Sequence, residues 1–471
     1  MGSALITRLV VFGATGDLAG RFLFPALARA IEAGELPADL AVVGAAPQDW
    51  DDETFTAHVT RRLEENAGQV SAGVRDSLVG RPRYHRVDFG DAATVARAVH
   101  GFRDTARDGP GDTSVGGSTG GAGAPVAVYL ALPPTLFPAA VAALGTAALP
   151  PGSRIVVEKP FGKDLAGAIA LNALLAQVSG GTPEAVFRVD HALAMPGVAD
   201  LQTRRTAALD EAGWDSGCFE QVDILWEETI ALEGRADFFD QTGVVRDVIQ
   251  NHLLHILALV AMEPPATTTG SDLHRVKLDV LRSTRVHVPG DAASQTSRAR
   301  YTAGELADGT GTVVPDYARE AGVDPDRHTE TWAEIRLEVD QPRWAGTTFV
   351  LRAGKALDTG RKGVLLHLRG PGPADPAADP AAGTAAGQVW IALDRSPAAA
   401  DPPAGAGEVV AYSRVLVDVL TGGSLLSVSS EEAEATWRIV EPVLRAWADG
   451  AAPLSHYRAG SSRPVPGRHR W

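Results

Sequence analysis

The segment from Arg246 to Pro265, RDVIQNHLLHILALVAMEPP, carries side chains that could transfer a proton. Its apolar residues have the spacing of a long amphipathic helix: Leu253, Leu254, Leu257 and Val260. His252 follows Asp247 by five residues, and an imidazole with an unperturbed pKa of about 6.5 suits proton transfer near neutral pH. A histidine packed in a helix with satisfied hydrogen bonds gives the same pattern, so both interpretations stay open. His255 comes three residues later, which does not match HxxxH spacing, and we expect no metal.

Two other segments are denser in polar groups than packing requires. In EKPFGKDL, Glu158–Leu165, Lys159 stands just beyond an apolar strand. In FRVDHAL, Phe187–Leu193, Asp190 and His191 close a run typical of a strand. Polar side chains at strand ends are common in the binding sites of α/β folds, so both segments are candidate site elements.

A glycine-containing turn follows the first apolar run, in RLVVFGATGDLA. Glycines let a backbone approach a pyrophosphate closely, and the start of the next helix favours an anion. The turn has the candidate residues Gly13, Ala14, Thr15, Gly16, Asp17 and Leu18. The spacing is G-x-x-G and not the full G-x-G-x-x-G, and an ordinary strand-to-helix turn also fits it.

The second strand of such a site usually ends in a residue that distinguishes NAD from NADP. An acidic residue there binds the ribose, and an arginine meets a 2′-phosphate. Here the segment Val43–Gln48, VGAAPQ, holds neither. Asp49 and Asp51 follow it, where a solvated turn and a helix start are the alternative interpretation.

The elements that must position these residues fall into two halves. Short apolar runs alternating with helical patterns predict an α/β, Rossmann-like domain with a parallel sheet over residues 1–190. Alternating stretches such as Thr331–Val339 and Thr348–Arg352 predict an α+β domain with a large, mainly antiparallel sheet over residues 191–471. The expected strands of the first half are Arg8–Phe12, Leu40–Val43, Val126–Leu132 and Arg154–Val157. Residues 108–125, rich in Gly and Ser, are expected to form a surface insertion.

Composition limits the classes of partner. The chain has 471 residues with 43 Lys and Arg against 58 Asp and Glu, a formal charge of −15, which disfavours nucleic acid and anionic membranes. Cys218 is the single cysteine, so no disulfide can form within the chain. No apolar stretch approaches the roughly 20 residues of a membrane span, and we expect a cytoplasmic protein.

The motifs, in this order, resemble those of glucose-6-phosphate dehydrogenases. The matching segments are GATGDLA, YLALPP at Tyr129–Pro134, EKPFGKDL, RVDH, EGR at Glu233–Arg235, RDVIQNHLL with AMEPP, RWAG at Arg343–Gly346 and LRAGKAL at Leu351–Leu357. They span nearly the whole chain. The resemblance implies a Rossmann domain, a domain built on a large antiparallel sheet, and a homodimer or homotetramer.

The resemblance also implies a reaction and a set of roles. The family oxidises the C1 hydroxyl of a hexopyranose 6-phosphate to the lactone and passes hydride to NADP or NAD. By motif, His252 matches the general base and Asp190 the carboxylate that stabilises its imidazolium. The implied substrate contacts are Lys159, His191, Glu228, Asp247, Arg352 and Lys355. The implied cofactor contacts are Gly13–Leu18, Tyr129 and Lys159.

Three departures from the family pattern remove groups that bind phosphate. Where the family has DHYLGKE, Ala192 and Met195 replace the Tyr and Lys that grip the sugar phosphate. Phe22 replaces a lysine that reaches the active site, and Pro47 replaces the arginine that meets the 2′-phosphate. We therefore expect a C1 dehydrogenase with changed specificity, acting on a sugar that can lack the 6-phosphate and using NAD at least as well as NADP.

Three alternatives stay open. The first is the ordinary family enzyme with a rebuilt phosphate site that uses Arg21, Lys163, Arg204 or Arg205. The second is a non-catalytic homologue that binds a sugar phosphate or a dinucleotide. The third is an oxidoreductase that uses the same fold on a different alcohol.

Overall fold

The computed structural model describes residues 5–80, 83–101, 123–211, 213–232, 234–267, 269–287, 294–370, 387–394 and 406–464. These residues form two compact units, each drawn from separate stretches of the chain. Unit 1 comprises Met1–Gly162, Ile169–Ala194 and Ala404–Ser429, and unit 2 comprises Lys163–Ala168, Met195–Pro403 and Ser430–Trp471. Most of the Gly-rich insertion expected at 108–125 lies outside the described residues.

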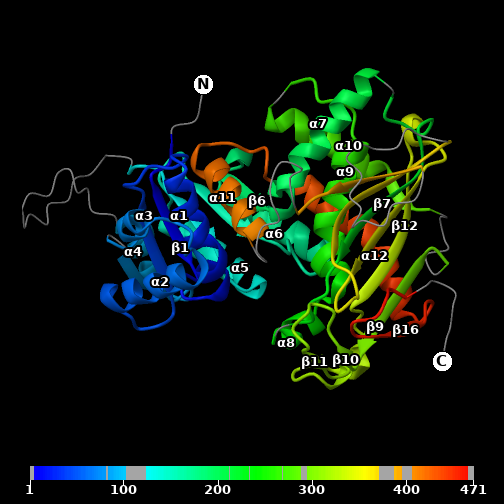
Figure 1. The fold of residues 1–471 in the computed structure, drawn as a ribbon. Helices are drawn as coiled ribbons and strands as arrows, with labels where there is room; N and C mark the ends of the chain where they lie inside the picture. Colours follow the sequence, from blue (N-terminus) through cyan, green and yellow to red (C-terminus); the bar gives the residue numbers. More distant parts are fainter. Residues whose placement is uncertain are drawn as a thin grey trace, which may run out of the picture. The chain divides into compact units, whose positions relative to one another are not determined.

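Unit 1 is built on a six-stranded sheet with the order β3-β2-β1-β4-β5-β6 (Figure 1). The strands are β1 (Arg8–Phe12), β2 (Ala41–Ala46), β3 (Arg83–Arg86), β4 (Ala127–Leu130), β5 (Arg154–Glu158) and β6 (Val186–Val189). All neighbouring pairs run parallel. The strands β4, β5 and β6 are buried along their whole length, as expected of apolar runs in a covered parallel sheet. This strand order is that of a Rossmann fold, so the predicted α/β class is confirmed.

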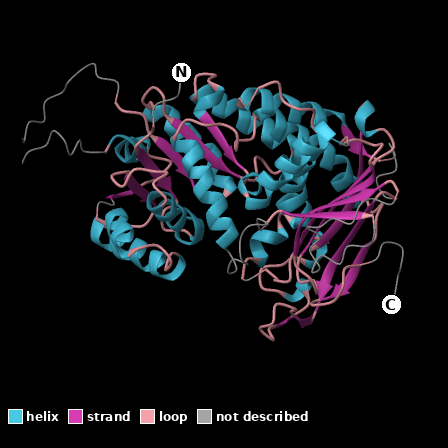
Figure 2. Ribbon diagram, turned by 45° about the horizontal axis from the view of Figure 1, so that its top comes forward, coloured by secondary structure: helices cyan, strands magenta, loops and turns pink. Residues whose placement is uncertain are grey.

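Helices flank the sheet of unit 1 (Figure 2). The first group, whose members pack on one another, is α1 (Phe24–Glu32), α2 (Asp52–Asn66) and α3 (Ala72–Val79). In the second group α4 (Ala92–His100) packs on α5 (Phe137–Ala147). Between β5 and β6 the chain forms α6 (Leu165–Val178). Asp51 and Asp91 accept hydrogen bonds from backbone N–H groups at the starts of α2 and α4, which fixes where these helices begin.

Helix α11 (Ala406–Leu420) belongs to unit 1 although most of unit 2 precedes it in the chain. It packs against α1. Arg154 donates hydrogen bonds to the carbonyl oxygens of Val419, Gly422 and Gly423, at 3.2, 2.9 and 2.6 Å. A guanidinium at a helix carboxyl end satisfies unpaired carbonyls and opposes the helix dipole. A single boundary at residue 190 therefore does not separate the compact units, because α11 returns to the first of them.

Unit 2 contains a mixed eight-stranded sheet in the order β15-β14-β7-β13-β12-β9-β16, with β8 paired to β12 (Figure 1). The strands are β7 (Phe219–Glu227), β8 (Thr284–Val286), β9 (Thr296–Thr302), β12 (Trp332–Val339), β13 (Thr348–Gly354), β14 (Arg361–Leu368), β15 (Gln388–Ala392) and β16 (Leu454–Arg458). The pairs β13–β7 and β16–β9 are parallel and the others antiparallel. The predicted large, mainly antiparallel sheet is confirmed. A separate short pair joins β10 (Gly304–Glu305) and β11 (Val313–Val314).

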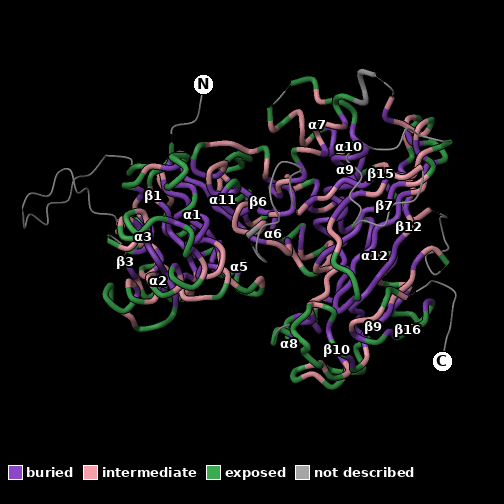
Figure 3. The backbone as a smooth tube through the Cα atoms, viewed as in Figure 1, coloured by how far each residue is buried: buried purple, intermediate pink, exposed green. Residues whose placement is uncertain are grey.

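Buried helices pack against the sheet of unit 2 (Figure 3). A π-helix, η5 (Val245–Leu253), contacts β7 and β13 and continues into α9 (Leu254–Ala261), in which every residue is buried. The other helices are α7 (Pro196–Glu211), α8 (Ala236–Asp240), α10 (Gly270–Ser283) and α12 (Ser430–Ala448). Among the described residues, no helix has the length and apolar composition needed to cross a membrane.

A buried ion pair joins α10 to α12. Lys277 Nζ lies 3.0 Å from a Glu432 carboxylate oxygen, and the two side chains are 1% and 0% exposed. His274 Nδ1 lies 3.0 Å from the other oxygen of the same carboxylate. Burial alone would raise the pKa of Glu432, but the Lys277 charge and the His274 hydrogen bond outweigh it and the pKa is lowered. The Glu432 carboxylate therefore stays ionised inside the helical layer.

Lys277→Met should strongly destabilise unit 2. It leaves the Glu432 charge buried without its ammonium partner, a loss of roughly 3–5 kcal/mol for pairs of this kind. Thermal unfolding followed by calorimetry measures the effect. Lys163→Met, at an exposed lysine, is the control and should leave the melting temperature unchanged. Equal melting temperatures for the two variants would contradict this account.

Candidate active site

An ion pair between Glu228 and Lys355 forms the centre of the candidate site in unit 2. Lys355 Nζ lies 2.6 Å from Glu228 Oε2, and Lys362 Nζ lies 3.4 Å from Glu228 Oε1. Glu228 follows β7 directly and Lys355 follows β13 directly, and these strands are parallel neighbours. Because parallel neighbours end at the same sheet edge, two residues far apart in sequence meet.

Backbone hydrogen bonds hold both residues beyond the strand ends. Glu228 N donates to Gly354 O at 2.9 Å, and Lys355 N donates to Thr331 O at 3.0 Å. The Tyr457 hydroxyl donates to Lys355 O at 2.6 Å. The two side chains are thus carried by a fixed backbone, which preorganises the pair for a ligand.

The charges of this pair are mutually stabilised. Burial alone would raise the pKa of Glu228, but attraction to Lys355 and Lys362 outweighs it and lowers the pKa to about 2. Burial alone would lower the pKa of Lys355, but attraction to Glu228 and Asp247 raises it. The site therefore presents a carboxylate and an ammonium group, which suit hydroxyl groups that both donate and accept hydrogen bonds.

His252 and Asp247 are on η5. In a π-helix, backbone hydrogen bonds join residues five apart, so the spacing of Asp247 and His252 places them on successive turns. His252 is 2% exposed, and its backbone N–H donates to Asn251 Oδ1 at 2.7 Å. Glu330 fixes the start of the helix, because its backbone oxygen and its carboxylate accept from the N–H groups of Val244 and Val245, both at 3.1 Å. The helix predicted over this segment is confirmed.

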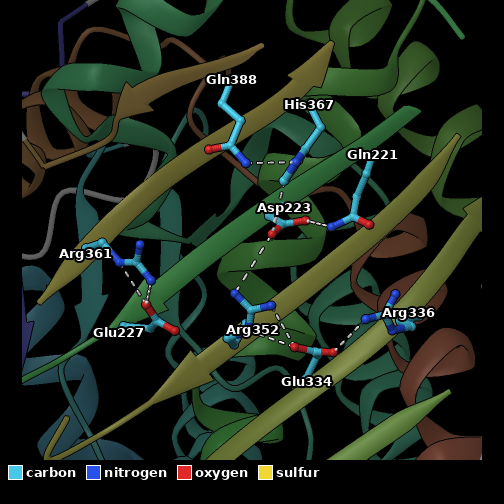
Figure 4. A network of polar contacts seen from close by, with 9 residues as sticks. All are labelled: Gln221, Asp223, Glu227, Glu334, Arg336, Arg352, Arg361, His367 and Gln388. Atoms are coloured by element: carbon cyan, nitrogen blue, oxygen red, sulfur yellow. Dashed lines mark hydrogen bonds and ion pairs between the residues drawn. The ribbon is translucent and has the colours of Figure 1, made fainter. Parts of the chain in front are cut away.

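Arg352, expected to contact substrate, lies elsewhere. On β13 it pairs in register with Leu225, whereas Ala353 pairs with Trp226, so Arg352 and Ala353 point to opposite faces of the sheet. Arg352 donates to Glu334 at 2.9 and 2.7 Å and lies 4.0 Å from Asp223 (Figure 4). The structure does not bring it to Glu228 and Lys355. It belongs to a polar network across β14, β7, β13 and β12.

In unit 1, the predicted nucleotide loop joins β1 to a short π-helix, η1 (Ala19–Leu23). Gly13 has a φ of +84°, and a Cβ there would lie 2.1 Å from Ala131 O. Gly13 N donates to Ala45 O at 2.8 Å and Gly16 N to Gly13 O at 2.9 Å. A tight turn that only glycine can make, between a buried strand and a helix start, fits the pyrophosphate of a nicotinamide dinucleotide.

A buried carboxyl group lies at the end of β5 in the same unit. The Tyr129 hydroxyl donates to Glu158 Oε1 at 2.5 Å, and the Tyr412 hydroxyl also bonds Glu158. Burial raises the pKa of Glu158 to about 7, although the hydrogen bond from Tyr129 and the charge of Lys159 oppose the shift. Tyr129, expected to contact cofactor, is 0% exposed and holds this carboxyl group. Sequence reasoning missed both Glu158 and Tyr412, since Tyr412 comes from α11, far along the chain.

The remaining predicted residues of unit 1 follow strand ends. Lys159 comes directly after β5, and Asp190 and His191 come directly after β6. Asp190 is 0% exposed, and its Oδ1 accepts from Ala192 N at 3.0 Å. The His191 ring stacks on Tyr412, with ring centroids 5.3 Å apart and an angle of 26° between the planes. These residues therefore share unit 1, whereas Glu228, Asp247, His252 and Lys355 share unit 2.

Comparisons with known proteins identify the family. Residues 10–199 match the glucose-6-phosphate dehydrogenase NAD binding domain, and residues 201–381 and 403–469 match the C-terminal domain of the same family. The chain belongs to the glucose-6-phosphate dehydrogenase family. Glucose-6-phosphate 1-dehydrogenase of Gluconobacter oxydans is 33% identical over 97% of this chain and 94% of its own length. Glucose-6-phosphate 1-dehydrogenase 2 of Mycobacterium bovis is 35% identical over 97% and 91%.

A solved structure supports the same assignment. The crystal structure of glucose-6-phosphate 1-dehydrogenase from Mycobacterium avium has a TM-score of 0.78 and 31% identity, and covers 99% of this chain and 98% of its own. The glucose-6-phosphate dehydrogenase family uses NAD(P) in oxidising a CH–OH group, in accord with the Rossmann sheet and the Gly13 turn.

The residues that replace a tyrosine or a lysine of the family pattern are packed among apolar and aromatic groups. Phe22, in place of a lysine, stacks on Tyr412 with centroids 5.5 Å apart, and the Arg21 guanidinium lies 5.4 Å from the Phe22 ring. Ala192 and Met195 are 0% and 2% exposed. Apolar groups thus fill positions where the family pattern has a lysine or a tyrosine that binds phosphate.

Two of the cations considered as replacements have other partners. Arg204 lies 2.8 Å from Asp200, and the buried guanidinium of Arg205 donates to Met262 O. Arg21 pairs with Asp17 at 3.4 Å, with both side chains largely exposed. Exposed pairs of this length are weak, so the Arg21 charge can be drawn to an anion at low cost.

Hydrogen bonds to Gln48 also hold the segment that follows β2. The Tyr84 hydroxyl donates to Gln48 O at 2.8 Å, and the Thr15 hydroxyl donates to Gln48 Oε1 at 3.0 Å. Pro47 stands between these contacts and β2 without a charge. Neutral groups therefore make these contacts of Gln48.

Gly13→Ala should weaken cofactor binding while the protein still folds. The new Cβ would meet Ala131 O at 2.1 Å, so the turn must change shape. We expect at least ~10-fold weaker binding of NAD and NADP, measured by calorimetric titration. Gly73→Ala is the matched control, since Gly73 lies in α3 with open space around its Cβ position. Wild-type affinity in Gly13→Ala would refute the role of the turn.

Glu158→Gln should change how stability depends on pH. The folded-state pKa of Glu158 is raised from 4.5 to about 7, so the protonated form is favoured and its contribution is lost as pH rises from 4.5 through 7. The variant cannot ionise but can still accept from Tyr129. Between pH 5 and pH 8 the wild type should lose up to about 3 kcal/mol relative to Glu158→Gln. Parallel pH profiles of the two melting temperatures would contradict the shift.

Proposed function

We propose that this chain oxidises the C1 hydroxyl of a hexopyranose, with glucose 6-phosphate as the leading substrate, to the lactone. The observation that carries the proposal is similarity across nearly the whole chain to proteins named glucose-6-phosphate 1-dehydrogenase. A nicotinamide cofactor would supply the acceptor for the hydride from C1. The turn from Gly13 to Leu18 would hold the cofactor phosphates, and Lys159 would contact cofactor and substrate.

In this proposal His252 is the general base. An imidazole nitrogen takes the proton of the C1 hydroxyl as the C1–H bond breaks, and Asp190 stabilises the imidazolium that results. Glu228 and Lys355 bind sugar hydroxyls, and Asp247 maintains the charge of Lys355. Because Lys355 and His252 are buried, few competing waters reach these groups. His191 is the remaining phosphate contact.

Specificity follows from the replaced cations. Losing one desolvated ion pair to a phosphate dianion costs about 2–5 kcal/mol, which is large relative to the binding energy of a sugar phosphate. Phe22 and Met195 therefore favour, as a second candidate, a hexose that lacks the 6-phosphate. Pro47 favours use of NAD at least as readily as NADP. The protein acts as a homodimer or homotetramer in the cytoplasm.

The test is a matrix of initial rates at 340 nm. Glucose 6-phosphate and free glucose are each combined with NADP and with NAD, using the full chain. Turnover of either sugar supports C1 oxidation, and the better sugar decides between the two candidates. Tight binding of NAD or NADP without turnover of either sugar would instead indicate a non-catalytic homologue.

His252→Ala should lower kcat by about 10²–10⁴-fold, the usual contribution of a general base. Cofactor affinity, measured by titration of protein fluorescence, should stay at the wild-type value, because His252 is proposed to act on the sugar hydroxyl and the Gly13 turn to bind the cofactor. If cofactor binding fell in parallel with kcat, His252 would be structural and its assignment as base would be wrong.

A further inference from the structure

We propose that Trp226 is a positioning residue that orients the imidazole of His252 and couples it to the Glu228–Lys355 pair. The inference rests on the proposed function, because it concerns the group assigned as general base. Trp226 belongs to none of the motifs that point to the family, and it emerges only from the packing of β7 against η5.

The strand register places Trp226 beneath η5. On β7, Trp226 pairs with Ala353 of β13 on one side and with Lys362 of β14 on the other. Directly paired residues share a sheet face, so these three side chains project together. The small side chain of Ala353 leaves room for the indole, and η5 covers β7 and β13 at this position.

The indole and the imidazole are stacked. Their centroids are 4.9 Å apart with 20° between the planes, and the two residues are 4% and 2% exposed. A near-parallel partner at this distance blocks rotation of the imidazole out of its plane, since the ring would strike the indole. The imidazole nitrogens therefore stay in one plane, which is the condition for accepting a proton along a fixed direction.

The same indole contacts the pair that binds sugar hydroxyls. Trp226 Nε1 donates to Glu228 Oε1 at 3.4 Å, and the Lys362 ammonium lies 4.5 Å from the indole centroid. Lys362 in turn lies 3.4 Å from Glu228. The electron-rich indole face attracts cations, so it holds Lys362 and also favours the imidazolium that forms at His252 during turnover.

Two variants separate the effect of the aromatic face of Trp226 from that of its indole N–H. Trp226→Phe keeps an aromatic face but loses the indole N–H, and Trp226→Leu loses both. Effects that arise through Glu228 are common to the two variants, so their difference isolates the aromatic face. We expect Trp226→Leu to reduce kcat at least ~10-fold, with Trp226→Phe within ~3-fold of the wild type.

Trp390→Leu is the matched control, a buried tryptophan on the edge strand β15 of the same sheet. It should lower the melting temperature about as much as Trp226→Leu while kcat stays near the wild-type value. The proposal is overturned if Trp390→Leu loses as much kcat, or if Trp226→Phe and Trp226→Leu are equally slow.

A spectroscopic measurement tests the stacking without turnover. In protein labelled with ¹³C at histidine Cε1, the His252 signal is assigned by its loss in His252→Asn. Ring-current shielding by the indole should move this signal upfield, and Trp226→Leu should return it downfield while Trp390→Leu leaves it in place. An unmoved signal overturns the proposal. A moved signal in a protein that oxidises neither sugar would refute the proposed function alone.

Discussion

The candidate site depends on charged groups that stay ionised although they are largely removed from water. Glu228 lies where desolvation favours the neutral acid, yet Lys355 and Lys362 keep it ionised, with a pKa of about 2. This requires that β7 and β13 end, and β14 begins, at the same edge of the sheet, because each strand carries one of the three residues at or just beyond that end. The strand register of the eight-stranded sheet therefore determines which charged side chains meet in the site. A shift of one residue in any of these strands would turn a charged side chain to the opposite face.

In unit 1, hydroxyl groups donate hydrogen bonds to a buried carboxyl group. Glu158 is more deeply buried than Glu228, but its partners include two tyrosine hydroxyls, and its pKa rises to about 7. A hydroxyl can donate to a carboxylate without supplying a charge, so it only partly offsets desolvation. One of these tyrosines comes from α11, which Arg154 anchors by its carboxyl end. The return of α11 to unit 1 thus determines the environment of a carboxyl group on β5.

Much of this organisation could be predicted from local sequence. The apolar run Arg8–Phe12 coincides with β1, and the expected strand at Thr348–Arg352 is the body of β13, because short runs rich in apolar residues indicate buried strands. Arg352 could not be placed from its motif, since adjacent residues on a strand face opposite ways and a motif match does not report the face. Nor could Tyr412 or Trp226 be found, because their partners are distant in sequence and no spacing records a contact between elements.

The substitutions that set this chain apart from the family pattern also follow a physical logic. A lysine at Phe22 would place an ammonium group beside Tyr412, whereas phenylalanine extends the aromatic contact that runs from Tyr412 to His191. Removing a cation and adding stacking keeps this corner of unit 1 packed while lowering its attraction for phosphate. Of the groups proposed to act on C1, Glu228, His252 and Lys355 lie in unit 2 and have their own partners there, whereas Asp190 lies in unit 1 and accepts a hydrogen bond from Ala192 N. The exchange at Ala192 keeps the backbone N–H that Asp190 accepts from, so a change of side chain there leaves this contact of the proposed proton-transfer group in place.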